Sequence, residues 1–295
     1  MESMDHAIAE WNPNAASVFW VRLPPITPGS LVTFHMRVGS ENAAVPENPE
    51  GVWRNGYAAV LGFDSEGPRY SDATQYDNHG EVNTNGQTEP LVTSGAVGSG
   101  IEFAQDTDAV LLPDAEVIRS LRPFTMSAWG WIPPDMNGGR IFGKSQRYLF
   151  VKLRSSGSQW EFQSRFQHTS SPPADDGPAN DVFNAWVGPT PSPGAWTNVT
   201  LRWTGAANSN QLSLYVDGSP ATAFNPNRSA TGDPVSDAGS PLAVGNSAGF
   251  GTGAGFDGGI DHVEISFVNR SADWIQFHVG SVKQSNMSYG PLVRR

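Results

Sequence analysis

Short runs of apolar residues, many of them alternating with polar ones, recur along the whole chain and end at glycine, proline, asparagine or aspartate. Their β-branched and aromatic content is typical of β-strands. We expect eleven strands, within residues 17–23, 31–39, 57–63, 100–104, 124–132, 148–154, 159–166, 197–203, 211–218, 241–245 and 261–268. Two stretches favour a helix: 114–121, with Asp114 as N-cap, and 270–280, with Ser271 as N-cap. This pattern predicts an all-β fold in which two antiparallel sheets form a jelly-roll sandwich.

The N-terminal segment, residues 1–54, carries two of these strands, 17–23 and 31–39, joined by the proline-rich turn 23–30. Two strands are too few to form a core of their own. We therefore expect 1–54 to be a small β-hairpin extension and linker that packs on the main sandwich of residues 55–295 or on another chain.

One aspartate stands out in the last expected strand. If the side chains of 261–268 alternate regularly, Asp261 shares a face with Val263, Ile265 and Phe267. That apolar face is expected to point into the core, and a buried carboxylate there needs a compensating cation or backbone N–H groups.

Charge and composition exclude several classes of function. The net charge is −11 and no basic cluster exceeds the terminal pair of arginines, which argues against nucleic acid as a partner. With no cysteine, disulfides and thiolate chemistry are excluded. No apolar run approaches 18 residues and the N-terminus has no signal-peptide pattern, so we expect no membrane insertion and no signal peptide. The expected location is extracellular, at a cell surface or on a virion.

Four stretches, in order, resemble one family. They are GSGIEFAQDTDAVLLPD (98–114), FTMSAWGWIPP (124–134), AWTNVTLRWTG with NQLSLYVDGSPA (195–221), and FDGGIDHVEISFVNRSADWIQ (256–276). Each is similar to a motif of the laminin G-like, concanavalin A-like jelly rolls of lectins and glucanases. The resemblance implies this fold from Tyr57 to the end of the chain.

Residues 11–40, WNPNAASVFWVRLPPITPGSLVTFHMRVGS, are similar to the second half of a small β module. That module precedes such jelly rolls in many bacterial surface proteins. The first half of the module is missing from this sequence, so the segment is either a fragment or a two-strand variant.

The resemblance also implies which residues a catalytic member of the family would carry. Glucanases of this fold carry E-x-D-x-E on one strand, which points both glutamates into the cleft. No glutamate here is followed two places later by aspartate. Two pairs of carboxylates have the spacing, but Asp64/Glu66 stands beside a glycine and Asp114/Glu116 lies in the expected helix 114–121. No G-x-S-x-G motif is present. We therefore expect that the protein is not an enzyme, and glycoside hydrolysis is the least favoured function.

Calcium is the metal that the resemblance implies, because these jelly rolls often hold it on carboxylates and carbonyls. Asp261 occupies the position of the family's closing-strand aspartate, and Asp64, after the strand 57–63, is its candidate partner. The alternative is that Asp261 only accepts hydrogen bonds and organises a turn.

Aromatic residues give the candidate ligand site. Five tryptophans within the family motifs are expected to pack in the core: Trp129, Trp131, Trp196, Trp203 and Trp274. Trp186 and Phe183 instead fall in 168–194, whose turn-forming residues predict a long surface loop. We expect both rings on one side of this loop, where they contact a ligand; alternatively, Trp186 pins the loop to the sandwich.

The sequence therefore predicts a recognition or adhesion module that binds glycan or protein through its rim loops. The alternative is a structural subunit of a virion decoration, tail or surface filament, with neighbouring subunits as partners.

Overall fold

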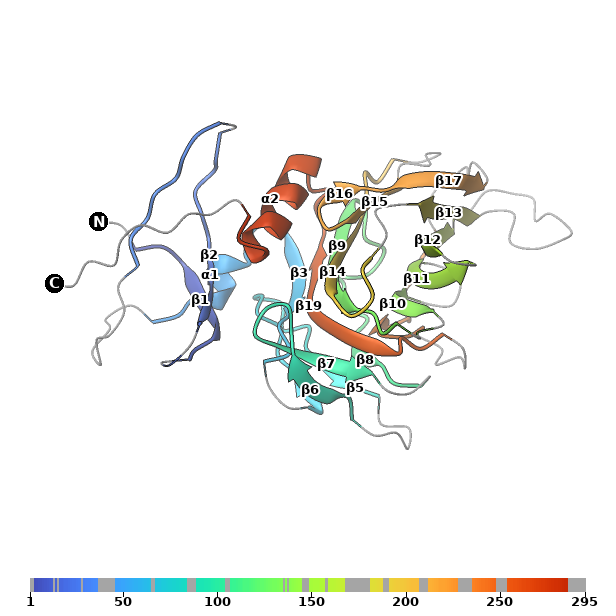
Figure 1. The fold of residues 1–295 in the computed structure, drawn as a ribbon, viewed down its shortest axis with the longest axis horizontal. Helices are drawn as coiled ribbons and strands as arrows, with labels where there is room; N and C mark the ends of the chain where they lie inside the picture. The colour runs from blue at the N-terminus through green and yellow to red at the C-terminus, as the bar shows by residue number, and fades with distance from the viewer. Residues whose placement is uncertain are drawn as a thin grey trace, which may run out of the picture.

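The computed structural model describes most of the chain. The residues outside the description are 1–2, 13, 15, 28, 37–45, 65–66, 84–88, 104–106, 135, 137, 145–148, 157–158, 168–180, 188–190, 207–211, 228–234, 248–253 and 286–295. Within the rest, two large antiparallel sheets pack as a sandwich, and a two-stranded sheet lies at one end (Figure 1). This confirms the all-β jelly-roll prediction.

The first large sheet has nine strands. In spatial order they are β17 (Thr222–Asn227), β13 (Asp181–Val187), β12 (Gln159–Gln167), β11 (Leu149–Ser156), β10 (Gly139–Lys144), β18 (Leu242–Val244), β8 (Val110–Leu112), β5 (Gly80–Val82) and β4 (Arg69–Tyr70).

The second large sheet has eight strands. Its order is β16 (Ser219–Pro220), β15 (Leu212–Val216), β14 (Trp196–Trp203), β9 (Phe124–Trp131), β19 (Gly258–Ser266), β7 (Ser99–Phe103) and β6 (Leu91–Ser94), while β3 (Tyr57–Leu61) pairs with β19 outside this path.

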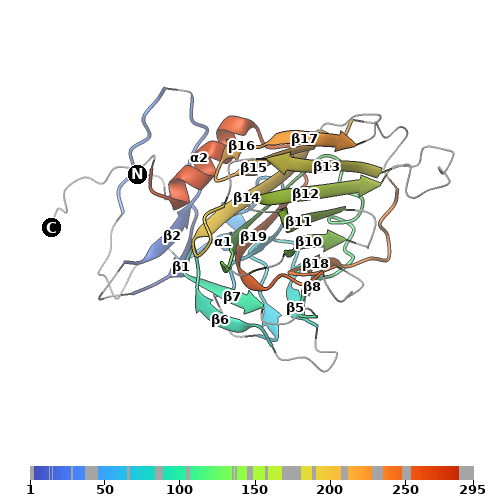
Figure 2. The same ribbon diagram turned by 45° about the vertical axis from the view of Figure 1, so that its right-hand side comes forward.

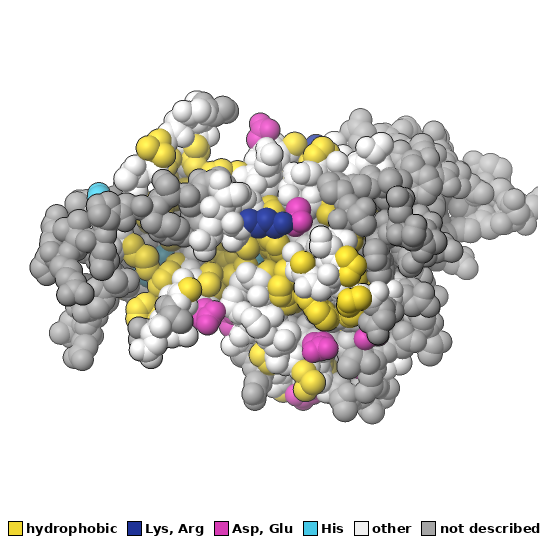
Figure 3. Space-filling view, viewed as in Figure 1, with side chains coloured by type: hydrophobic (Ala, Val, Ile, Leu, Met, Phe, Trp, Pro, Cys, Tyr) yellow, Lys and Arg dark blue, Asp and Glu magenta, His cyan; other side chains and the backbone are white. Residues whose placement is uncertain are grey.

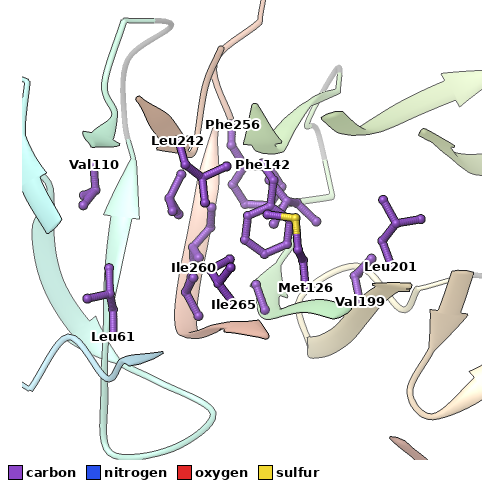
Figure 4. Packing of buried hydrophobic residues seen from close by; sticks show 14 of the residues in the cluster. Leu61, Val110, Met126, Phe142, Val199, Leu201, Leu242, Phe256, Ile260 and Ile265 are labelled. Carbon is purple, nitrogen blue, oxygen red and sulfur yellow. The ribbon is translucent and has the colours of Figure 1, made fainter. Parts of the chain in front are cut away.

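The core lies between the two large sheets (Figure 4). Strand β9 shows how the sequence builds it: Phe124, Met126 and Ala128 belong to the core, while Thr125, between two of them, and Trp129, after Ala128, face outward. Each large apolar side chain buried in this way contributes about 1.5–3 kcal/mol. The alternation in the sequence therefore fixes which face of the sheet is inside.

Helix α2 (Ala272–Val282) lies against the outer face of the eight-stranded sheet (Figures 1 and 2). As expected, Ser271 is its N-cap, and the Ser271 Oγ accepts a hydrogen bond from the backbone N–H of Trp274 at 3.1 Å. Ile275 and Val279 of the helix are buried in a cluster with Trp129. An amphipathic helix thus closes one outer face of the sandwich.

The N-terminal segment packs beside this helix. Strand β1 (His6–Glu10) pairs with β2 (Val18–Val21), and the short helix α1 (Pro49–Val52) follows. Residues 31–36, the described part of the expected strand 31–39, have no strand conformation. The hairpin partner of 17–23 is instead the earlier stretch 6–10.

The helix expected at 114–121 is also wrong, because the structure has a turn there. Asp114 does not act as an N-cap. Its carboxylate accepts hydrogen bonds from Arg119 at 2.9 Å and from the backbone N–H of Gly239 at 2.6 Å, and it lies 3.4 Å from the Lys144 ammonium. Long-range contacts therefore outweigh the local capping signal.

No helix in the described part of the chain is both long and apolar enough to cross a membrane.

Candidate functional site

Strand β19 is interrupted by a bulge at its centre. Its pairing with β9 shifts register between Asp261 and Glu264, and His262 has a φ of 44°. Ile260 before the bulge and Val263 after it both belong to the core between the sheets. A bulge resets the alternation of side chains, so a regular strand pattern does not hold across it.

Asp261 therefore lies on the outer face of the sheet, not on the core face as expected. Its neighbour Ile260 points inward, and its partner across the strands, Trp129, packs under α2. The aspartate is nevertheless fully buried, with 0% of its surface exposed. The turn 95–98 and the strands around it cover the side chain.

The Asp261 carboxylate is only partly satisfied. The backbone N–H of Val97 donates to its Oδ2 at 2.8 Å, whereas its Oδ1 is buried with no hydrogen-bond partner among the described atoms. Gly95 makes room for the group, since a Cβ there would come within 2.4 Å of Oδ2. Burial raises the Asp261 pKa well above its usual value, although N–H groups of the turn and of His262 oppose this.

Asp64 lies on the other side of the same turn. A Cβ on Gly98 would be 3.3 Å from the Asp64 Oδ1 and 3.3 Å from the carbonyl oxygen of Ala9. The Asp64 side chain is exposed by its surface area, yet the protein around it is dense enough that desolvation raises the pKa of its carboxyl, to about 7. The N–H of Ser99 opposes this shift and the charge of Glu10 adds to it, and solvent at the exposed side limits the shift. The charge of Asp64 in turn raises the pKa of Asp261.

These residues fit a hard cation in donor type. Asp64 and Asp261 offer carboxylate oxygens around one turn, one buried oxygen is unpaired, and the Ala9 carbonyl borders the same place. Calcium takes six to eight oxygen ligands of these kinds. Asp64 and Asp261 would hold the ion, and the charge of a bound cation would offset the cost of burying the Asp261 carboxylate.

If calcium binds here, chelation should lower the melting temperature, because a ligand that binds only the folded state stabilises it. At a free calcium concentration 100 times the Kd, the loss on chelation is about 2.7 kcal/mol. Asp261→Asn should abolish the difference, whereas Asp77→Asn, at a side chain that is 81% exposed, should keep it. Identical calorimetric scans of the wild type with and without chelator would leave Asp261 only its hydrogen-bonding role.

Phe183 and Trp186 are far from this turn in the fold, because they lie in β13 of the nine-stranded sheet. The expected loop 168–194 is therefore wrong for 181–187, while 168–180 lies outside the described residues. Trp186 is paired with Phe162, and Phe183 with Arg165. Both residues belong to one strand and not to a turn, so the turn-based reason for placing the two rings together is lost. The ligand-binding role of the two residues stays a prediction.

A second group of polar side chains lies on the outer face of β19, and we call it the histidine cluster: His262, Glu264 and His278. The Nε2 atoms of both histidines approach the same Glu264 oxygen, Oε1. Sequence reasoning missed this cluster because His278 belongs to α2 and meets β19 only in the folded chain. The spacing His262-x-Glu264, which puts both side chains on one face of a strand, was the one local signal.

The sandwich and its closing strand β19 define a class of protein, the concanavalin A-like jelly rolls. The family model described as the concanavalin A-like lectin/glucanases superfamily matches residues 104–276. The chain belongs to this superfamily. No curated protein matches it in sequence.

Several solved structures share the fold at low identity. The binding domain of Paraclostridial Mosquitocidal Protein 1 is 12% identical with a TM-score of 0.55, and the match covers 78% of this chain and 53% of that one. The receptor-binding domain of botulinum neurotoxin mosaic serotype C/D is 12% identical with a TM-score of 0.50, over 78% and 51%. Trypanosoma rangeli sialidase in complex with sialic acid is 15% identical with a TM-score of 0.52, over 78% and 33%. The chain thus spans about half the length of the two binding domains and a third of the sialidase.

Proposed function

We propose that the chain is a non-catalytic recognition module that binds a glycan or a protein through the loops at the rim of its sandwich. The observation that carries this is the unequal covering of the two sheets. In the described part of the chain, α2 and the N-terminal segment cover the outer face of the eight-stranded sheet (Figures 1 and 2). That leaves the nine-stranded sheet and the loops at its ends for a partner.

Two considerations support recognition over catalysis. Two of the similar structures are binding domains by name, which is an argument from fold alone. The carboxylate pair that glucanases of this fold place on one strand has no counterpart in the sequence, since no E-x-D occurs. A recognition module of this kind would act outside the cell or on a cell or particle surface.

The first test concerns the predicted ligand residues. Trp186→Ala should weaken binding of a ligand by about 2 kcal/mol, a factor of about 30, because single aromatic residues often dominate such contacts. Binding would be measured by calorimetry, and Phe183→Ala would test the second position. Trp11, a tryptophan of the N-terminal hairpin that is 56% exposed, gives the matched control Trp11→Ala, which should bind normally. Loss of folding in Trp186→Ala, as seen by circular dichroism, would instead make Trp186 a core residue and refute this site.

Finding the ligand itself requires a glycan array probed with the purified chain in the presence of calcium. Binding to a defined set of glycans that Trp186→Ala loses supports the proposal. Release of reducing sugar from β-glucans by the wild type, lost in a single Asp or Glu variant, would overturn the non-catalytic assignment.

One surface favours the alternative, a structural subunit that assembles with its neighbours. Apolar side chains are exposed on the projecting N-terminal loop (Figure 3), and Leu31 is 87%, Met36 51% and Phe34 44% exposed. Exposed apolar groups that lie together often mark protein contacts. Light scattering decides this alternative: a mass that rises with concentration in the wild type, but not in Leu31→Ser, would favour assembly.

A further inference from the structure

The histidine cluster has the geometry of a set of metal ligands. The Nε2 of His262 lies 2.8 Å from the Oε1 of Glu264, and the Nε2 of His278 lies 2.6 Å from the same oxygen. These three atoms all lie within 4.8 Å of one another. Among the residues that the structure describes, no other group of three or more His, Asp or Glu side chains brings its donor atoms this close.

Two elements position the three side chains. The bulge in β19 gives His262 a φ of 44°, a conformation that residues other than glycine rarely adopt. Glu264, two residues later, projects from the same face of the strand. His278 comes from α2, one turn beyond Trp274. Unusual backbone conformations of this kind concentrate at functional sites.

Aromatic rings hold both imidazoles in place. The Trp20 ring is stacked on His262 with 4.4 Å between centroids and on His278 with 5.5 Å. Trp274 is stacked on His278 at 4.7 Å and an interplanar angle of 13°. The rings therefore have little freedom to turn, and the side chains of His262 and Glu264 are only 3% and 4% exposed. Fixed ligands in an apolar surrounding are what a metal site requires.

We propose that His262, Glu264 and His278 form a binding site for a divalent transition-metal ion of the zinc type. Two imidazole nitrogens and one carboxylate oxygen are ligands that zinc prefers, whereas calcium prefers oxygen alone. The site is therefore distinct in chemistry from the carboxylates of Asp64 and Asp261. The side chain of His278 is 15% exposed, which leaves an approach for the ion and for a water molecule as fourth ligand.

The fit requires a small movement. Zinc bonds of about 2.0–2.1 Å in a tetrahedron separate neighbouring ligand atoms by about 3.3 Å. The Nε2 atoms of His262 and His278 lie 2.8 and 2.6 Å from Glu264 Oε1, so each must move outward by roughly half an ångström. Each imidazole would coordinate the ion through Nε2 and keep a proton on Nδ1. If an imidazole carries protons on both nitrogens before the ion binds, the proton on Nε2 leaves to solvent.

Metal binding at this place would join two elements, β19 and α2, beneath a residue of a third part of the chain. His262 and Glu264 belong to β19, His278 to α2, and Trp20, which covers both imidazoles, to the N-terminal hairpin. An ion held here would therefore fasten the helix to the sheet and stabilise the surface on which the hairpin packs.

The test uses the full chain, stripped with chelator and dialysed, and titrated with zinc chloride in a calorimeter. We expect one zinc per chain and a higher melting temperature in zinc. His278→Gln should weaken zinc binding by about 100-fold, because one of three protein ligands is lost. Cobalt(II) should give visible absorption bands of a low-coordinate site that His278→Gln removes. The matched control is His35→Gln, at an exposed histidine on the N-terminal loop, which should bind zinc like the wild type.

Three results would overturn the proposal: no stoichiometric zinc binding at micromolar concentration, equal zinc binding by wild type and His278→Gln, or equal loss in His35→Gln. If His278→Gln fails to fold, Glu264→Gln provides the second variant, since it keeps the side-chain volume. Asp261→Asn should leave zinc binding intact, which separates this site from the calcium prediction.

Discussion

Trp20→Ala is expected to loosen the N-terminal segment from the sandwich and to lower the free energy of unfolding by about 3 kcal/mol. Trp20 is stacked on both histidines of the cluster and contacts Trp53 edge to face at 5.1 Å. It packs against the cluster formed by Ala7, Val52, Trp53, Tyr57 and Val60, which joins the N-terminal segment to β3. Removing the indole leaves a cavity at this junction and exposes the imidazoles to water.

The measurement is denaturant unfolding in the presence of chelator, so that a bound ion does not contribute. Limited proteolysis gives a second reading, because a loosened segment should be cleaved faster. Trp11→Ala is the control: Trp11 belongs to the same hairpin but is 56% exposed, so its loss should change stability little. If the midpoint and the cleavage rate of Trp20→Ala match those of the wild type, Trp20 does not hold the segment in place.

The parts of the fold that the sequence predicted correctly are those with strong local signals. Strands β9 and β14 alternate core and outer residues along their length, and α2 begins at the cap Ser271, a few residues after the closing strand β19 ends at Ser266. Both signals depend on residues that are neighbours in sequence, so they can be recognised without the three-dimensional structure.

The errors share a physical cause, which is that long-range contacts decided the local conformation. A bulge in β19 put Asp261 on the outer face, although the regular alternation predicted the core face. Residues 181–187 form a strand next to the edge of the nine-stranded sheet, because β12 and β17 pair with them on both sides. The proline, glycine, aspartate and asparagine content of the whole stretch 168–194 had indicated a loop.

The two candidate sites also differ in whether the sequence could reveal them. Asp64 and Asp261 were proposed together because a family resemblance supplied the pairing, and the fold places both around the turn 95–98. No resemblance supplied the histidine cluster. Its side chains come from a strand, and from a helix that meets that strand only through tertiary packing, so it became visible only in the structure.

Lys144→Met is expected to lower the free energy of unfolding by about 3–5 kcal/mol, the usual cost of removing one partner from a buried ion pair. The Lys144 side chain is 2% exposed, and its ammonium lies 3.6 Å from Asp237 and 3.4 Å from Asp114. Burial already raises the pKa of Asp237 despite this ammonium. Without it, the negative charge of Asp237 would remain buried and less compensated, while methionine fills almost the same volume.

A double-mutant cycle separates charge from packing. Asp237→Asn removes the charge but keeps the shape, so Lys144→Met combined with Asp237→Asn should cost less than the sum of the two single changes. A coupling of roughly 1–3 kcal/mol in denaturant unfolding is the expected result for groups in direct contact. Asp237 also accepts a hydrogen bond from the backbone N–H of Ser120 at 2.7 Å. Because the amide oxygen of asparagine can accept the same bond, Asp237→Asn alone measures mainly the effect of removing the charge. Strictly additive costs would show that the charges of Lys144 and Asp237 do not stabilise each other, which would contradict the prediction.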